Sequence, residues 1–317
     1  MKRLVSRKSR VGFTIIELLV VIGILGILLA ALLPMVTGSR DSALTAKCKN
    51  NMKNLALGVI SYAQANGEYG HFPSAGFYRS IDPKSRKKSY YPQRSWISNK
   101  GDIQMLNRST GNVYLGDVAH FTDSEDDARN AVTNGAIWHS AGASFEVYRC
   151  PVHAREYEKE HNGRQPGWSF MMNQEFGFNR DGQGNIGFFG ASVKSGITVS
   201  TDTDGRRKST ASRGHDKVLL FAEVQGIEVT DKGVSLKPAS GGDQTDAVLE
   251  YAKESMGFNH KIGKQRWGGN VAFADGHVDL IMMPKASGYI RDLTRYLCQG
   301  FDVPHDGSTY KPRDIDK

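Results

Sequence analysis

One long apolar segment near the N-terminus constrains this chain more than any other feature. From Phe13 to Leu33, about 21 residues include a single charged side chain, Glu17. A helix rises about 1.5 Å per residue, so this segment matches the roughly 30 Å hydrocarbon core of a bilayer. The basic residues before Gly12 have no acidic residue among them, and they are Lys2, Arg3, Arg7, Lys8 and Arg10. We therefore expect residues 13–33 to cross the inner membrane once, with the remainder of the chain outside the cytoplasm.

Other uses of an apolar N-terminus fit less well. A secretory signal has a shorter apolar stretch of about 7 to 15 residues and a small-x-small cleavage site. Here Ala30 and Ala31 are adjacent and Pro34 follows closely, which is a poor match. No cysteine directly follows the segment, so a lipoprotein anchor is not indicated. An ordinary uncleaved anchor stays open, because its length and flanking charge would be the same.

The order of residues around the start of the segment separates these alternatives. The sequence Gly12-Phe13-Thr14-Ile15-Ile16-Glu17-Leu18 resembles the prepilin signal of type IV pilins and type II secretion pseudopilins. The resemblance implies cleavage after Gly12 by a prepilin peptidase and methylation of the new amino group on Phe13. It also implies assembly with other pilin or pseudopilin subunits on an inner-membrane platform, with a role for Glu17.

Glu17 is informative on physical grounds as well. A carboxylate in an apolar segment is costly and is normally retained for a partner. The freed amino terminus of a neighbouring subunit would lie at a similar depth, so pairing could neutralise both charges. The alternative is that Glu17, near the membrane surface, extends to the lipid headgroups.

The helix is expected to continue beyond the membrane. An apolar face recurs at steps of three or four residues, formed by Leu44, Cys48, Met52, Leu55, Val59 and Tyr62 or Ala63. Asn66-Gly67 provides a stop. We therefore expect a leader over residues 1–12, a helix over 13–66, and an extracytoplasmic domain over 67–317.

The outer domain is predicted to be loop-rich, followed by a sheet. Long polar stretches reach about residue 145, and strand-like runs then lie at residues 145–150, 168–172, 217–224, 270–274 and 277–282. Asp275-Gly276 is typical of a two-residue hairpin turn. A short helix is expected at residues 289–297. The predicted fold class is α+β and pilin-like, with a long transmembrane helix packed on an antiparallel sheet.

Several segments resemble a family of bacterial prepilin-like proteins named for a C-terminal His, nine residues, then Asp-Gly. They are Cys48–Leu55, Tyr148–Pro151, Ser169–Asn173, Val218–Glu223 and Gly268–Val278. The chain departs from this pattern because His260 precedes Asp275 by fifteen positions, and residues 261–266 look like an inserted loop. The resemblance implies architecture and processing.

No cofactor, metal or catalytic centre is predicted. His260, Asp275 and His277 include zinc-ligand types, but two of them flank a hairpin turn, so we prefer a structural role for that group. Three cysteines, Cys48, Cys150 and Cys298, are expected outside the cytoplasm, where oxidation is permitted. Three cannot all pair internally, and the spacing selects no pair.

The charge does not favour nucleic acid as a partner. The net charge of +8 includes five basic residues before Gly12, which leaves 36 basic against 33 acidic residues, or +3. We therefore expect a non-enzymatic pseudopilin or pilin subunit that contacts lipid and sister subunits. Two alternatives stay open: a membrane-tethered binding or enzymatic domain that uses the pilin signal only for export, and a filament-tip binding module with Tyr90, Tyr91 and Trp96 exposed together.

Overall fold

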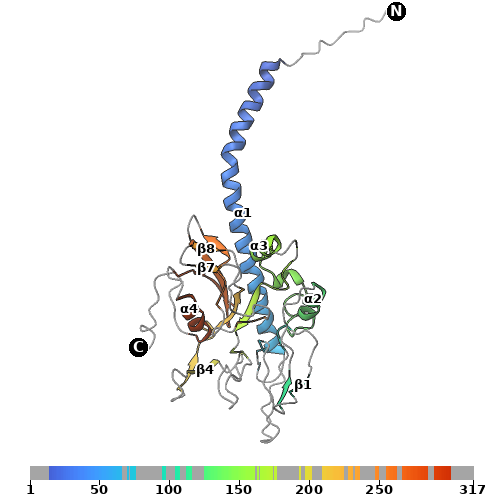
Figure 1. The fold of residues 1–317 in the computed structure, drawn as a ribbon, viewed down its shortest axis with the longest axis vertical. Helices are drawn as coiled ribbons and strands as arrows, with labels where there is room; N and C mark the ends of the chain where they lie inside the picture. The colour runs from blue at the N-terminus through green and yellow to red at the C-terminus, as the bar shows by residue number, and fades with distance from the viewer. Residues whose placement is uncertain are drawn as a thin grey trace, which may run out of the picture. The chain divides into compact units, whose positions relative to one another are not determined.

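The structure of the 317-residue chain is a computed structural model. The described residues are 14–65, 70, 72–75, 95–97, 104–107, 112–115, 125–160, 163, 165–173, 175–176, 193, 197–201, 209–224, 228–230, 233–235, 247–249, 255–262, 266–284 and 289–300. The chain divides into two compact units, Met1–Ala43 and Leu44–Lys317. Helix α1 begins in the first unit and ends in the second, which holds every other element (Figure 1).

Helix α1 runs from Ile15 to Ala65 and begins with a capping box. The Thr14 backbone N–H and hydroxyl both donate to Glu17 Oε2, at 2.8 and 2.7 Å, and the Glu17 N–H donates to Thr14 Oγ1 at 3.3 Å. The large apolar side chains from Ile15 to Leu29 are between 48 % and 82 % exposed. Within the described part of the chain, no helix combines the length and apolarity needed to cross a membrane. The transmembrane assignment of residues 13–33 therefore stays a prediction.

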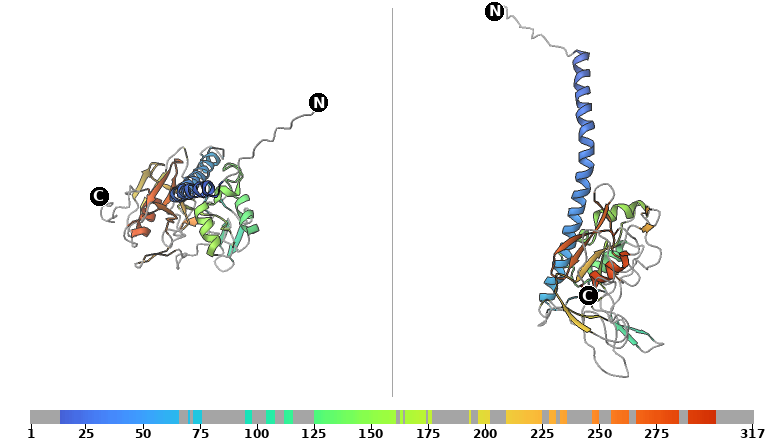
Figure 2. Two further views of the ribbon diagram at one scale, coloured as in Figure 1. Left: turned by 90° about the horizontal axis from the view of Figure 1, so that it is seen from above. Right: turned by 90° about the vertical axis from the view of Figure 1, so that its left-hand side faces the viewer.

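The second half of α1 buries the apolar face that the sequence indicates. Cys48, Met52, Leu55, Val59 and Ala63 are all fully buried, and Leu44 and Tyr62 pack partly against them. Lysines at positions 47, 49 and 53 are exposed on other faces. This part of α1 lies beside the central sheet (Figure 2).

The central sheet has six strands and is organised around its longest one, β11. The strands are β3 (Phe170–Asn173), β6 (Leu219–Glu223), β9 (Val248–Leu249), β10 (His260–Ile262), β11 (Arg266–Phe273) and β12 (Val278–Met282). One edge of β11 pairs with β12, while its other edge pairs first with β10 and then with β6. Strands β3 and β9 complete the order beyond β6.

The sheet corrects the expectation of a wholly antiparallel arrangement. Strands β3 and β9 pair in parallel, with Met172 opposite Val248, so the sheet is mixed. A two-residue strand such as β9 is too short to show an alternating pattern in the sequence.

The remaining elements surround this sheet or form small hairpins. The helices are α2 (Glu125–Thr133), α3 (Pro151–Glu160) and α4 (Tyr289–Cys298). The two-stranded pairs are β1 (Gln104–Asn107) with β2 (Asn112–Leu115), β4 (Ile197–Thr201) with β5 (Ser209–Arg213), and β7 (Glu228–Thr230) with β8 (Gly233–Ser235).

The expected strand at residues 145–150 is wrong. Phe145–Tyr148 instead forms a short 3-10 helix, η1, whose Phe145 and Tyr148 are buried. The run Phe145–Cys150 is rich in aromatic and apolar residues, which suggested a strand. Here they point into the core from a helical turn, which tertiary contacts select over local propensity.

The hairpin between β11 and β12 is one residue longer than the expected two-residue turn. The Gly276 N–H donates to Phe273 O, and the Phe273 N–H donates to His277 O, so three residues lie between the paired positions. Gly276 has a φ of +90°, which gives the pattern of a turn followed by a bulge glycine. A Cβ at this position would lie 3.0 Å from Ile60 Cδ1, so the turn packs against α1.

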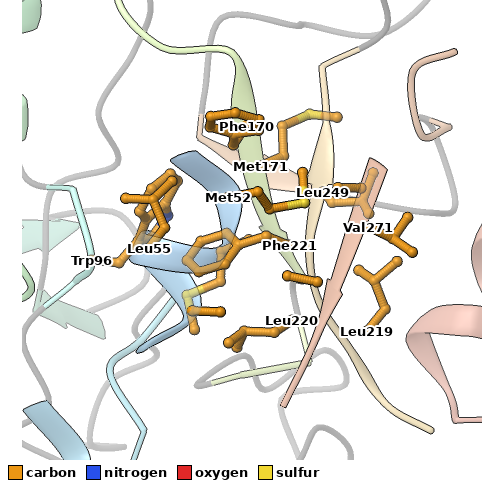
Figure 3. Close-up of a cluster of buried hydrophobic side chains, with 14 of the residues drawn as sticks. Met52, Leu55, Trp96, Phe170, Met171, Leu219, Leu220, Phe221, Leu249 and Val271 are labelled. Atoms are coloured by element: carbon orange, nitrogen blue, oxygen red, sulfur yellow. The ribbon is translucent and has the colours of Figure 1, made fainter. Parts of the chain in front are cut away.

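The core lies between α1 and the central sheet. Met52 and Leu55 of α1 approach Phe170 and Phe221 of the sheet (Figure 3). Trp96 is fully buried, stacks on Tyr148 and donates its indole N–H to Ala247 O at 3.2 Å. Trp96 therefore cannot contribute to an exposed aromatic patch, and Tyr90 and Tyr91 lie outside the described residues.

Candidate functional site

Of the predicted processing and assembly residues, the structure describes Glu17 alone. Gly12 and Phe13 lie outside the described residues. Glu17 is exposed in the first turn of α1, where Thr14 bonds its carboxylate through Oε2. The carboxylate thus caps its own helix, and Oε1 has no hydrogen bond within the described part of the chain.

A second group of chemically active residues lies inside the outer unit. Cys48, Cys150, Glu223 and His260, here called the buried cluster, place one ligand atom each within 4.8 Å of one another. Each residue is at most 1 % exposed. They come from α1, the residue before α3, the end of β6 and the start of β10.

Asn51 holds the two cysteine-bearing segments together. It lies one helical turn after Cys48 and donates its side-chain amide to the carbonyls of Glu146 and Arg149, at 2.9 and 2.8 Å. Cys150 directly follows Arg149. Its carbonyl oxygen accepts a hydrogen bond from the Ala154 backbone N–H, so Cys150 caps α3, and Pro151 takes the first helical position. These contacts fix Cys150 opposite Cys48.

The sheet places Glu223 and His260 side by side. Gly268 of β11 pairs with His260 on the same edge where Val271 pairs with Ala222, so β10 and β6 meet end to end along β11. The segment that leads into β10 passes close to β11 at Gly257. This close contact requires glycine at position 269, because a Cβ there would lie 1.9 Å from the Gly257 carbonyl oxygen.

The Glu223 carboxylate accepts hydrogen bonds from several directions. Its Oε1 receives His260 Nε2 at 2.8 Å, the Cys48 thiol at 3.1 Å and the Asn270 side-chain amide at 2.7 Å. The Asn270 backbone N–H, at the junction of β10 and β6, also donates to Oε1 at 3.2 Å. Asn259 holds Oε2 at 3.1 Å. The orientation of this buried carboxylate is therefore fixed.

His260 is held from both ring nitrogens. Nδ1 lies 3.1 Å from Thr45 Oγ1, while Nε2 faces Glu223 and lies 3.6 Å from Cys150 Sγ. The hydroxyl of the partly buried Thr45 at Nδ1 sets which nitrogen faces the centre of the cluster.

The pKa values in the cluster depend on one another. Burial opposes ionisation of Glu223, but the positive charge of His260 and hydrogen bonds from His260, Cys48 and Asn270 hold the pKa of Glu223 below its ordinary value. Burial disfavours the imidazolium, yet Glu223 and Cys150 raise the pKa of His260 to about 10. Burial also opposes the Cys150 thiolate, but Cys48 and His260 lower its pKa to about 7. Burial and the neighbouring negative charges raise the pKa of Cys48 well above its usual value.

The structure separates His260 from Asp275 and His277, the three residues considered as zinc ligands from the sequence. His277 hydrogen-bonds Asp275 at 2.5 Å on the exposed hairpin turn and lies 3.7 Å from Asp279. His260 is instead buried with Glu223 and the two cysteines. The third cysteine, Cys298, is a free buried thiol at the end of α4.

The sequence analysis did not predict the buried cluster, although Glu223 gave one local signal. Glu223 directly follows five buried apolar residues, Val218–Ala222, at a position where a sixth would be expected. Cys48 lies on the apolar face of α1 and reads as a small hydrophobic residue. Three of the five segments that resemble the His-nine-Asp-Gly family supply one cluster residue each, namely Cys48, Cys150 and Glu223. Only the fold brings these residues together with His260.

Comparison with known proteins agrees with the N-terminal features. Residues 7–33 match the family described as the prokaryotic N-terminal methylation motif. The chain is 37 % identical over 101 residues to the type II secretion system core protein G of Pseudomonas aeruginosa strain PAO1, which covers 32 % of this chain and 68 % of that protein. No solved structure matches the chain.

Proposed function

Because the chain belongs to the pilin-like pseudopilins of type II secretion, we propose that it is a structural subunit that assembles through its N-terminal helix. In this proposal a prepilin peptidase cuts after Gly12, Phe13 is methylated, and the processed chain joins a type II secretion pseudopilus or a type IV pilus-like filament.

The continuous apolar surface at the start of α1 is the observation that carries this proposal. Large apolar side chains from Ile15 to Leu29 are about half exposed or more, and contiguous exposed apolar surface marks contact with lipid or protein. The same residues fall inside the matched methylation motif at 7–33. We propose that they lie in the inner membrane before assembly and against sister subunits afterwards.

The rival proposal of a membrane-tethered enzyme or binding domain draws no support from the buried cluster. Its residue types occur in catalytic sites, but none is more than 1 % exposed. A substrate would have to open the packing between α1 and the sheet to reach them. The cluster is better suited to holding the unit together.

The test is to purify surface or periplasmic filaments from cells that express the tagged full chain. A subunit of the filament co-purifies with it, whereas a tethered domain stays in the membrane fraction. A Gly12→Val variant is the matched control, because an uncut leader would keep the chain out of the filament. Absence of the wild-type chain from every filament preparation would contradict the proposal.

A further inference from the structure

We propose that Cys48, Cys150, Glu223 and His260 form a structural zinc site that joins α1 to the central sheet. The four residues place one ligand atom each within 4.8 Å of the others, and all four are buried. Two thiolates, an imidazole and a carboxylate are ligand types that zinc accepts in a four-coordinate site. The proposal does not depend on filament assembly.

The spacing of the ligand atoms suits one small ion. In a tetrahedral zinc site, bonds of about 2.0 to 2.3 Å place neighbouring ligand atoms roughly 3.3 to 3.8 Å apart. In the cluster, His260 Nε2 lies 2.8 Å from Glu223 Oε1, Cys48 Sγ lies 3.1 Å from Glu223 Oε1, and Cys150 Sγ lies 3.6 Å from His260 Nε2. Small side-chain shifts would therefore admit the ion.

The surrounding polar groups support the ligands as outer-shell residues support metal sites. Thr45 Oγ1 lies 3.1 Å from His260 Nδ1, so Nδ1 can keep its proton and donate while the Nε2 lone pair faces the ion. Asn259 and Asn270 hold the two carboxylate oxygens of Glu223. Asn270 Oδ1 is also buried and has no hydrogen-bond partner among the described residues. This region therefore contains a buried acceptor whose hydrogen bond is not formed.

Two simpler explanations account for fewer of these contacts. A buried ion pair would explain Glu223 and His260 but gives no reason for two thiols directed at the same point. A disulfide between Cys48 and Cys150 would explain the thiols but neither the imidazole nor the carboxylate. One ion explains all four residues.

Charge and protons balance on binding. Zn²⁺ displaces the thiol protons of Cys48 and Cys150 and the proton on His260 Nε2, which pass to solvent. Two thiolates and one carboxylate then leave a single negative charge on the complex, and the amides of Asn259 and Asn270 donate toward it. With four protein ligands the site is closed, as in structural rather than catalytic zinc sites.

The experiment uses the full chain purified in detergent without chelators. We expect about one zinc per chain by elemental mass spectrometry. Replacement by Co²⁺ should give thiolate-to-cobalt charge-transfer absorption and the visible bands of tetrahedral cobalt. Unfolding with chelator should then release three reactive thiols.

Variants identify the ligands. Cys150→Ser should lower the zinc content to less than about a tenth, whereas the matched control Cys298→Ser, which alters another buried cysteine, should retain it. Thr45→Val should weaken zinc binding about 10- to 100-fold while every ligand is preserved. If Cys150→Ser does not fold, the cobalt spectrum of the wild-type chain and the Thr45→Val affinity decide the question.

Two outcomes would overturn the proposal. One reactive thiol with no zinc would show a Cys48–Cys150 disulfide. Three reactive thiols, with neither zinc nor a cobalt spectrum, would show a metal-free buried ion pair.

Discussion

Thr14 and Glu17 cap helix α1 reciprocally, each side chain bonding the backbone N–H of the other at 3.3 and 2.8 Å. Glu17 therefore has a partner within its own chain before any neighbouring subunit arrives. Only Oε2 takes part in these bonds, so Oε1 stays available for the amino terminus of another subunit. Capping and charge pairing can thus be separated by mutation.

Replacing Glu17 with Ala should leave membrane insertion and cleavage after Gly12 intact but stop assembly. A neutral residue inserts at least as readily as an acid, whereas an unpaired buried amino terminus would cost about 3 to 5 kcal/mol in the bundle. Cleavage is followed by gel shift, and assembly by shearing or crosslinking in the same cells.

Two variants separate the roles of the carboxylate. Glu17→Gln keeps an oxygen for capping but removes the charge, so it should also fail to assemble, while Thr14→Ala loses capping at a cost of about 1 kcal/mol and should still assemble. Normal incorporation of Glu17→Gln would show that charge pairing is not required. Loss of cleavage in Glu17→Ala would assign Glu17 to peptidase recognition.

The mature chain should begin at Phe13 and carry one methyl group on its amino terminus. The prediction follows from the methylation motif matched over residues 7–33. Mass analysis of the N-terminal peptide from membranes checks it. An intact Met1, or a start near Ala31, would require a different processing route.

Replacing Gly276 with Ala should lower the free energy of unfolding by about 1 to 3 kcal/mol. The backbone has a φ of +90°, and a new Cβ would lie 3.0 Å from Ile60 Cδ1. Thermal unfolding of the full chain in detergent gives the difference. Gly142→Ala is the matched control, since Gly142 has a φ of +97° but open space around it, and its cost should be smaller. Equal midpoints for the two variants would show that contact with α1 adds nothing.

Replacing Asn51 with Ala should destabilise the unit by about 2 to 4 kcal/mol. The change removes both bonds to the Glu146 and Arg149 carbonyls and leaves those acceptors without their donor. Thermal unfolding and protease digestion of the full chain measure the effect. Asn54→Ala, on the same helix and half-buried, should change stability by less than about 0.5 kcal/mol. Similar losses in both variants would point to helix propensity rather than to these bonds.

The elements with strong local patterns could be predicted from the sequence. The apolar face of α1, strand β6 and helix α4 follow from period and composition, because each repeats its pattern over at least five residues. The segment at Phe145–Tyr148 was mistaken for a strand, since its aromatic and apolar composition is typical of strands. The contact from Asn51 of α1 to the Glu146 carbonyl, which favours the helical turn, is not visible in the local sequence.

The buried cluster depends on contacts that local patterns do not contain. Cys48 lies 175 positions from Glu223, and Cys150 lies 110 positions from His260. Residues 261–266 were interpreted as an inserted loop, but Lys261 and Ile262 pair with Trp267 and Arg266 in the β10–β11 hairpin. That pairing brings His260 beside Glu223, and no local signal in the sequence specifies it.

The directional bonds between α1 and the sheet also have a mechanical consequence. A subunit that is held by its N-terminal helix receives tension along α1, and the second half of that helix must transmit it. Apolar side chains can slip past one another, but the bonds of Cys48 and Asn51 resist a one-turn slip of about 5.4 Å. The bonds of Cys48 and Asn51 would then resist shear between α1 and the rest of the unit, and single-molecule pulling should show a higher rupture force for the wild-type chain than for Asn51→Ala.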